Sequence, residues 1–282
     1  MALLEVKSIG KKYRSFTLKD VSFSLEKGRI TGFIGRNGAG KTTVLKLLYA
    51  LIKRDGGSIL YEGEDILTCE KRYKNEVGLL FGGFQFYPGF KLKKITSVLA
   101  PFYEKWDQAQ YEEYLTLFGL DEEKKVKELS AGMQVKYGLA IALSHGAEIL
   151  LLDEPTSGLD PVSRDELLDL FENLAQQGKS ILFSTHVISD LDKCADDIVY
   201  IQKGSLLAAE PLARFRDRYI AFDGESSLLE KKDRSHFLYL HDHGGRFQAV
   251  AKKEDEAAIP LSSRKATLEE IMIALERGKE EA

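Results

Sequence analysis

The chain has 282 residues, a formal net charge of −4 and a pI near 5.9, so its overall charge predicts no attraction to nucleic acid or to anionic lipid. Its composition, with 44% hydrophobic and 30% charged residues, is that of a soluble globular protein. The sequence shows no apolar run of the roughly 18–20 residues that a membrane helix needs, no signal sequence, and no cysteine spacing typical of a metal site or a disulfide framework.

The first third of the chain predicts short strands and one helix. Val44, Leu47, Leu48 and Leu51 recur at i, i+3, i+4 and i+7, which is the spacing of an amphipathic helix. The segment 55–58, Asp-Gly-Gly-Ser, is a turn signal. Strands are expected on both sides of this helix and turn, at 3–7, 18–25, 29–34, 58–61 and 76–81.

Between the strand at 29–34 and the helix lies Gly35–Thr42, which fits the phosphate-binding pattern G-x-x-x-x-G-K-[ST]. Its glycines allow backbone conformations that a Cβ forbids, so the amides of the loop and of the helix N-terminus can point together at an anion. Lys41 adds a charge for the outer phosphates, and Thr42 offers a hydroxyl to Mg²⁺. The alternative is a glycine-rich turn without a ligand, and the flanking strand and helix argue against it. We expect a nucleoside triphosphate to contact Gly35, Asn37, Gly38, Gly40, Lys41, Thr42 and Thr43.

Residues 91–128 predict a mostly helical insert, because apolar side chains recur there at helical spacing. Beyond it, strands at 149–152, 180–184 and 197–201 alternate with helices at 135–143, 164–175 and 191–195, which predicts a parallel sheet covered by helices. After residue 211 the pattern changes to three strands, a Gly-Gly hairpin turn and a capped helix. We therefore expect a small α+β appendage over 212–282.

Two carboxylates, Asp153 and Glu154, directly follow the apolar run Ile149–Leu152. In open α/β sheets, ligands bind at the carboxyl ends of the strands. Asp153 is therefore a candidate for holding Mg²⁺ together with Thr42, and Glu154 for orienting or deprotonating an attacking water. The alternative is that the two side chains only cap the turn before Pro155.

A second candidate anion site lies at Leu129–Gln134, where Ser130 is a natural N-cap for the following helix. Small residues at a helix N-terminus leave amides free for an anion. Because one nucleotide needs only one phosphate loop, this second site suggests that two chains meet head to tail and complete each other's sites.

These motifs occur in the order found in the ATP-binding subunits of ABC transporters, which residues 2–210 resemble. Leu129–Gln134 resembles the signature motif, Ile149–Glu154 the Walker B strand, Ser157–Asp160 the D-loop and Ser184–His186 the switch region. The resemblance implies an α/β P-loop NTPase fold, with an ABC ATPase domain over 1–211 that has a mostly parallel sheet and the helical insert. It also implies an ATP hydrolase that binds ATP and Mg²⁺. Such a chain forms a homodimer or heterodimer of ATPase subunits and lies in the cytoplasm, peripherally on the inner face of the cell membrane, through a separate permease.

The resemblance also assigns roles to single residues. Tyr13 is similar to the aromatic residue that stacks on adenine in this family, although alone it would be interpreted as a loop tyrosine. His186 matches the switch histidine that reads the γ-phosphate, and together with Lys41 and Glu154 it forms the implied catalytic set. The remaining assigned residues contact the partner's ATP or communicate between the two sites: Ser130, Gly132 and Asp160.

Two positions depart from the family pattern. Ala131 stands where many members have glycine. Gly82 stands where a glutamine or glutamate normally meets Mg²⁺ and the permease, with Gln85 three residues later, so metal binding or coupling is expected to be altered. The segments Tyr103–Asp107 and Ser184–Leu191 resemble the ABC-2-type exporters of drugs, peptides or lipids in Gram-positive bacteria.

An aromatic cluster next to the Gly82 position keeps two interpretations. Its residues either pack in the core or form a surface that receives the permease, because exposed aromatic side chains mark interfaces. The cluster consists of Phe84, Phe86, Tyr87 and Phe90.

Two other classes of protein are compared with a transporter subunit. A soluble ABC ATPase acting on nucleic acid or ribosomes is disfavoured because the chain has one ATPase half, no heptads and no basic patch. A GTPase or kinase is disfavoured because the Asn-Lys-x-Asp guanine motif is absent and Leu129–Gln134 would have no role. We therefore expect an ATPase subunit that drives a separate membrane permease, an exporter of a drug, peptide or lipid, and that contacts no nucleic acid.

Overall fold

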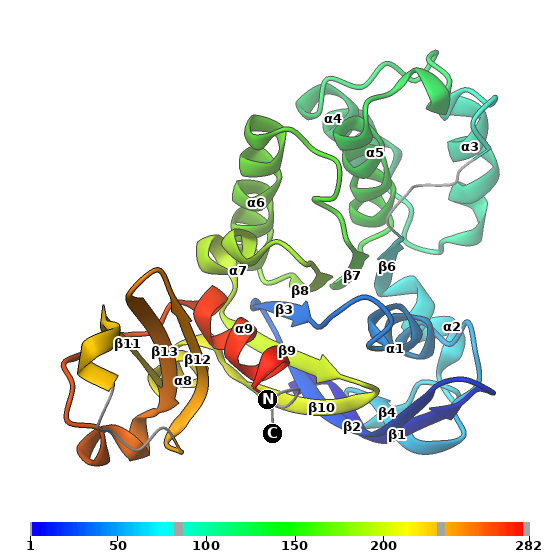
Figure 1. Cartoon of the computed structure of the whole chain (residues 1–282). Coiled ribbons are helices and arrows are strands. Elements are labelled where there is room, and N and C mark those ends of the chain that lie inside the picture. Colours follow the sequence, from blue (N-terminus) through cyan, green and yellow to red (C-terminus); the bar gives the residue numbers. More distant parts are fainter. Residues whose placement is uncertain (1, 82–86, 230–234, 279–282) are drawn as a thin grey trace. The chain divides into compact units, whose positions relative to one another are not determined.

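A computed structural model describes residues 2–81, 87–229 and 235–278. The chain divides into two compact units, Met1–Ala209 and Glu210–Ala282 (Figure 1). The predicted α/β class is confirmed, because the first unit contains a large, mostly parallel sheet with helices on its faces. The departure at Gly82 and Gln85 lies outside the described residues.

Ten of the described strands form one sheet, in the order β5-β4-β1-β2-β10-β9-β3-β8-β7-β6. Strands β9, β3, β8, β7 and β6 pair in parallel, whereas β5, β4, β1 and β2 pair antiparallel. The bounds are β1 Ala2–Lys12, β2 Thr17–Glu26, β3 Ile30–Ile34, β4 Gly56–Tyr61, β5 Glu64–Asp65, β6 Val77–Leu80, β7 Ile149–Asp153, β8 Ser180–Ser184, β9 Asp197–Gln202 and β10 Ser205–Pro211.

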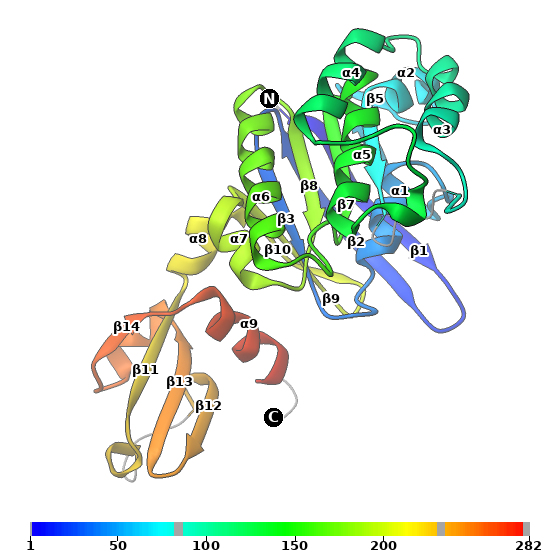
Figure 2. The ribbon, with the colours of Figure 1, turned by 90° about the horizontal axis from the view of Figure 1, so that it is seen from above.

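Helices cover both faces of the parallel strands. Figure 1 shows α5 and α6 on one side of β3, β8 and β7 and α1 on the other, and Figure 2 shows α5 and α6 lying along these strands. None of the helices in the described part of the chain has the length and hydrophobicity needed to cross a lipid bilayer. The bounds are α1 Lys41–Leu48, α2 Glu70–Asn75, α3 Leu92–Leu99, η1 Ala100–Phe102, α4 Gln108–Leu117, η2 Val126–Glu128, α5 Ala131–Ser144, α6 Pro161–Gln176 and α7 Ile188–Cys194.

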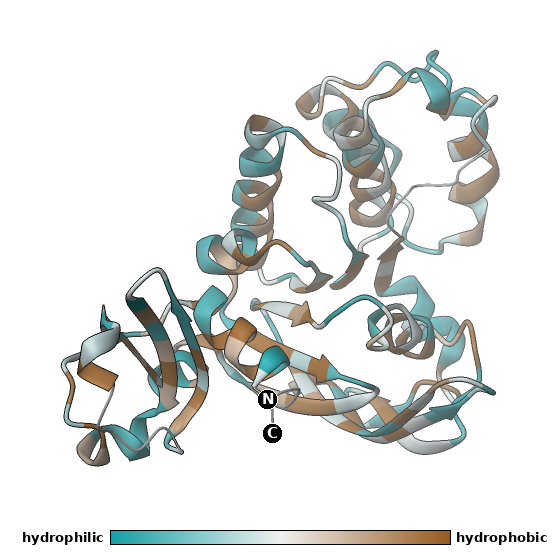
Figure 3. Ribbon diagram, in the orientation of Figure 1, coloured by the Kyte–Doolittle hydropathy of each residue, from teal (hydrophilic) through white to brown (hydrophobic). Residues whose placement is uncertain are grey.

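The central strands are buried along their whole length, because helices remove both faces from water. In Figure 3 the hydrophobic colour accordingly runs along β6 and β7. Gly32 in the middle of β3 shows how tightly the layers pack. A Cβ at this position would lie 2.0 Å from Cδ2 of Leu191, a buried residue of α7. A side chain at position 32 would therefore force the side chain of Leu191 to move.

The helical insert is present where it was predicted, as α3, η1 and α4. Its packing against α5 includes a buried set of hydroxyl groups. Thr96 Oγ1 lies 2.8 Å from the Tyr111 hydroxyl and 2.9 Å from the Tyr137 hydroxyl, and the latter donates to the carbonyl of Leu92 at 3.0 Å. These bonds satisfy polar groups that would otherwise be buried without partners.

The aromatic cluster beside the insert is only partly described. Phe84 and Phe86 lie outside the described residues. Tyr87 and Phe90 are exposed, and their ring centroids are 5.5 Å apart in an edge-on contact. For these two residues the core interpretation was wrong, because their rings contact each other on the surface instead of entering the interior.

The second unit is a four-stranded antiparallel sheet in the order β12-β13-β11-β14, with α9 packed on β12 and β13. The expected hairpin turn at Gly244-Gly245 joins β12 to β13, and the expected capping box between Thr267 and Glu270 begins α9. The bounds are α8 Leu212–Asp217, β11 Tyr219–Glu225, η3 Ser226–Leu229, β12 Phe237–His243, β13 Arg246–Lys252, η4 Lys253–Ala258, β14 Ser263–Lys265 and α9 Leu268–Arg277.

Some expected boundaries were wrong. The helix after the phosphate loop ends at Leu48 instead of reaching Leu51, because Ala50 takes a left-handed φ of +54° and the chain leaves the helix. Leu51 is consequently 50% exposed. The first strand continues to Lys12, and neither α2 nor β10 was anticipated, since neither carries a clear apolar repeat.

Replacing Thr96 with valine should lower the free energy of unfolding by about 1–3 kcal/mol, because the buried hydroxyl of Tyr111 would lose its partner. Urea denaturation measures this change. The matched control is Ser97→Ala in the same helix, which removes an exposed hydroxyl and should change stability by no more than about 0.5 kcal/mol. Equal effects of the two variants would contradict a stabilising role for the buried hydroxyl set.

Candidate nucleotide-binding site

The loop 35–40 joins β3 to α1, and all three of its glycines take backbone conformations that other residues adopt only with strain. Gly35 has a φ of +153°, and a Cβ there would lie 2.3 Å from the carbonyl oxygen of Ile201. Gly40 has a φ of +116° and is the N-cap of α1, where no described side chain caps the helix. The first amides of α1 therefore lack a side-chain acceptor, which is the arrangement that binds phosphate oxygens.

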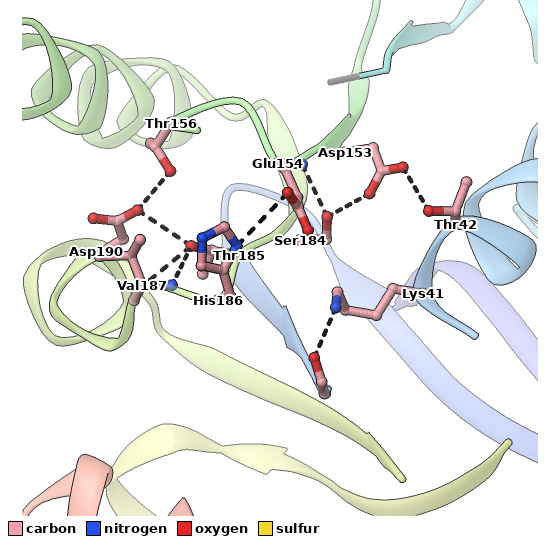
Figure 4. Close-up of polar contacts among 11 residues, drawn as sticks. Lys41, Thr42, Asp153, Glu154, Thr156, Ser184, Thr185, His186, Val187 and Asp190 are labelled. Carbon is pink, nitrogen blue, oxygen red and sulfur yellow. Dashed lines mark hydrogen bonds and ion pairs between the residues drawn. The ribbon is translucent and has the colours of Figure 1, made fainter. Parts of the chain in front are cut away.

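Lys41 begins α1 and is almost enclosed, with 6% of its surface exposed. Its Nζ donates a hydrogen bond of 2.7 Å to the carbonyl of Gly35, so the side chain lies along the loop (Figure 4). Burial lowers the pKa of Lys41, while the negative charges of Glu154 and Asp153 oppose this effect by favouring the ammonium form. The result is a poorly solvated cation beside free amides, which suits a phosphate group.

Asp153 ends β7 and is held from two sides (Figure 4). Its Oδ2 accepts a hydrogen bond from Thr42 Oγ1 at 2.8 Å, and its Oδ1 accepts one from Ser184 Oγ at 2.6 Å. Asp153 and Ser184 are register partners in the parallel strands β7 and β8, so strand pairing itself brings them together. The carboxylate consequently has a fixed position next to the start of α1.

Glu154 has a φ of +50°, in the left-handed region that residues other than glycine seldom adopt. Its N–H donates to the carbonyl of Ser184 at 3.1 Å and to Ser184 Oγ at 2.9 Å, which holds this conformation in place. Its Oε2 lies 3.6 Å from His186 Nδ1, an ion pair when the histidine is protonated. Backbone strain that the surrounding structure maintains is common at functional sites.

A pocket of about 510 Å³ opens beside these groups. It brings together every phosphate-loop residue expected at the nucleotide except Gly35. The lining consists of Ser15, Phe16, Asn37, Gly38, Gly40, Lys41, Thr42, Thr43 and Glu154.

The aromatic side of the pocket differs from the simplest expectation. Phe16 lines it, whereas Tyr13 is 42% exposed and is not part of the lining. The two residues belong to one connection between β1 and β2, where the N–H of Tyr13 donates to the carbonyl of Phe16 at 2.7 Å. The sequence reasoning missed Phe16, although a second aromatic residue in the same short connection was a usable signal.

The sequence reasoning also missed the role of Ser184, which it had placed only within a motif. Ser184 is fully buried and bonds both Asp153 and Glu154. Its position at the carboxyl end of the neighbouring parallel strand was the signal that could have identified it, because side chains at those ends meet at one edge of the sheet.

The residues assigned to the partner's nucleotide lie outside this pocket. Ser130 caps α5 by accepting a hydrogen bond from the N–H of Met133 at 3.2 Å, and it is exposed. Asp160 caps α6 by accepting bonds of 3.0 Å from the amides of Val162 and Ser163, and hydrogen bonding to Ser163 lowers the pKa of its carboxyl. Gly132 lies in the first turn of α5. A Cβ at this position would be 3.5 Å from the side chain of Leu159 and 3.8 Å from that of Ser163.

Comparison with known proteins identifies the family of the chain. A family model described as ABC transporter matches residues 18–157. The chain is 32% identical to the ABC transporter ATP-binding protein YtrB of Bacillus subtilis (strain 168), over 93% of this chain and 94% of that protein. It is 31% identical to the lantibiotic transport ATP-binding protein SrtF of Streptococcus pyogenes, over 81% of this chain and 95% of that protein.

A solved structure of the ATP-binding subunit of an ABC transporter matches with a TM-score of 0.69 and 28% identity, covering 76% of this chain and 92% of that chain. The alternative of an ATPase acting on nucleic acid finds no support in these likenesses. The likeness to these relatives confirms the predicted family: the chain belongs to the ATP-binding proteins of ABC transporters, P-loop subunits that hydrolyse ATP and work with membrane permeases.

Proposed function

We propose that the subunit binds ATP with Mg²⁺ in the pocket beside Lys41 and uses hydrolysis to drive a separate permease that exports a peptide of the lantibiotic class. The observation that carries the hydrolysis part is the connected group of Thr42, Asp153, Ser184 and Glu154 at the edge of the pocket. One hydrogen-bonded group joins the helix that starts at the phosphate loop to the carboxylate of Asp153 and to the backbone of Glu154, an arrangement that supports positioned phosphoryl transfer to water.

The residues present fit Mg²⁺. Thr42 Oγ1 and Asp153 Oδ2, which are in contact at 2.8 Å, are the hydroxyl and carboxylate oxygens that this ion prefers. The described residues hold no group of three or more His, Cys, Asp and Glu side chains arranged for a metal. This agrees with an ion that takes its other ligands from phosphates and water. When bound there, Mg²⁺ would neutralise phosphate charge.

The chain's own residues account for the remaining chemistry. Lys41 places its positive charge against the outer phosphates, where negative charge develops as the terminal bond breaks. The carboxylate of Glu154 orients a water and accepts its proton. His186 Nδ1 lies 3.6 Å from that carboxylate, and this histidine is proposed to contact the γ-phosphate.

A second ATPase subunit, identical or different, is proposed to complete the site. Ser130 and Asp160 are exposed at helix N-termini and do not line the pocket of their own chain. A facing subunit would bring them towards the nucleotide of the first, where the N-terminus of α5 would offer amides to phosphate and Asp160 would connect the two sites. Tyr13, with its exposed ring, is proposed to stack on the adenine.

The permease is proposed to dock on the helical insert and to hold the subunit peripherally on the cytoplasmic face of the membrane. Exposed apolar side chains gather in this part of the sequence, and such surfaces mark interfaces. They are Tyr87, Phe90, Val98, Phe102 and Leu117. The substrate class rests on the likeness to the lantibiotic transport protein SrtF.

Export is tested in cells that carry the subunit and its permease. Loss of the subunit should raise sensitivity to a lantibiotic, and the intact chain but not Glu154→Gln should restore resistance. Unchanged sensitivity across a panel of lantibiotics would contradict this substrate class while leaving the ATPase assignment intact.

Replacing Glu154 with glutamine should lower ATP turnover by about 10²–10⁴-fold, because the positioned carboxylate that accepts the proton is lost. ATP binding should remain, and gel filtration with ATP should show a trapped dimer. Phosphate release measures the first effect. A variant that keeps full turnover would assign the base to another residue.

Replacing Ser184 with alanine should lower turnover about tenfold, because Asp153 and Glu154 would each lose a hydrogen bond that orients them. Ser180→Ala is the matched control, since Ser180 is equally buried at the other end of β8 and bonds the carbonyl of Glu26. Both variants remove one buried hydroxyl from the same strand. A comparable loss in the two would show that buried hydroxyls of β8 matter only for stability.

A further inference from the structure

Glu154, which lines the pocket, and His186 belong to two different loops. A buried carboxylate forms hydrogen bonds to both loops. The first loop follows β7 and carries Glu154 and Thr156, and the second follows β8 and carries Thr185 and His186. Asp190 Oδ2 accepts a hydrogen bond from Thr156 Oγ1 at 2.6 Å and lies 3.3 Å from Thr185 Oγ1 (Figure 4). One oxygen therefore joins residues that are far apart in the sequence.

From this geometry we infer that Asp190 is a positioning residue, which sets the place of His186 relative to Glu154 and so controls the rate of ATP hydrolysis. The inference rests on the proposed role of His186. Asp190 is 1% exposed and does not line the pocket, so it acts through its neighbours and does not touch the nucleotide.

The contacts of Asp190 lead directly to His186. The hydroxyl of Thr185, held by Asp190, accepts a hydrogen bond from the N–H of Val187 at 2.9 Å. The N–H of Asp190 in turn donates to the carbonyl of Val187 at 3.2 Å. These bonds fix the backbone on both sides of His186, whose own side chain is 56% exposed. The direction of the imidazole therefore depends on the short turn that Asp190 stabilises.

The other oxygen of this carboxylate strengthens the argument for function. Asp190 Oδ1 is buried, and no group among the described residues donates a hydrogen bond to it. A buried acceptor without a donor opposes folding, so stability alone gives no reason for a carboxylate at this position. The two threonine bonds across separate loops supply a reason, because they give Glu154 and His186 a common support.

The test uses the full chain and measures the turnover number, the dissociation constant for ATP and the melting temperature. Asp190→Ala should lower turnover by about 10- to 100-fold, the effect of a small misplacement in an active site, with ATP affinity within about twofold of the parent. Thr185→Val should reproduce the loss, and Thr185→Ser, which keeps the hydroxyl, should restore turnover. Ser189→Ala, an exposed neighbour on α7, should behave like the parent.

The decisive comparison is made in a chain that lacks the imidazole. In a His186→Ala background, Asp190→Ala should cause no further loss of turnover, because both changes remove the same positioned group. An equal additional loss in that background would overturn the inference. So would a loss of ATP affinity and melting temperature in parallel with turnover. If Asp190→Ala does not fold, the Thr185→Val and Thr185→Ser pair decides in the same background.

The inference and the proposed function fail in different ways. Full turnover in His186→Ala would contradict the proposed role of the histidine and, with it, any action of Asp190 through that residue. Impaired turnover in His186→Ala together with full turnover in Asp190→Ala would overturn the Asp190 inference alone.

Discussion

The pairing of β7 with β8 is the interaction on which the site depends. Its register places Asp153 opposite Ser184, and the hydrogen bond between their side chains joins the two strand ends. From Asp153 the connection continues to Thr42 at the start of α1, and from Ser184 to the backbone of Glu154. A shift in register would separate all of these groups at once. The parallel sheet therefore determines the geometry of the candidate site as well as the fold.

The site contains charged side chains that are almost completely buried, Lys41 and Asp153. Lys41 is buried, and the neighbouring carboxylates of Glu154 and Asp153 offset only part of the free-energy cost of that burial, because the pKa of Lys41 is still lowered. A phosphate group entering the pocket would meet a cation whose hydration had already been removed, so little reorganisation remains to be made during reaction. The left-handed backbone conformation of Glu154 is also energetically unfavourable. Two hydrogen bonds to Ser184 hold it in place.

The sequence was sufficient for the features that depend on local pattern. Three features have signals that lie within a single short stretch of sequence: the phosphate loop, the buried strand before Asp153 and the capping box at Thr267. The structure has the expected strands and helix at these places. It was insufficient where distant segments meet. That Ser184 holds Asp153, or that Phe16 lines the pocket, depends on strand pairing and on the path of a connection. The orphaned oxygen of Asp190 depends on burial, which no spacing reveals.

The close packing at Gly32 has a consequence for how this chain can change in evolution. A side chain at position 32 and the leucine at position 191 compete for the same space between β3 and α7. A larger residue at position 32 is compatible with the fold only when the side chain of Leu191 moves or is replaced by a smaller one. The two sites should therefore vary together among relatives, although 159 residues separate them. Because β3 leads into the loop 35–40 and α7 follows His186, that exchange would preserve the alignment of the two halves of the candidate site.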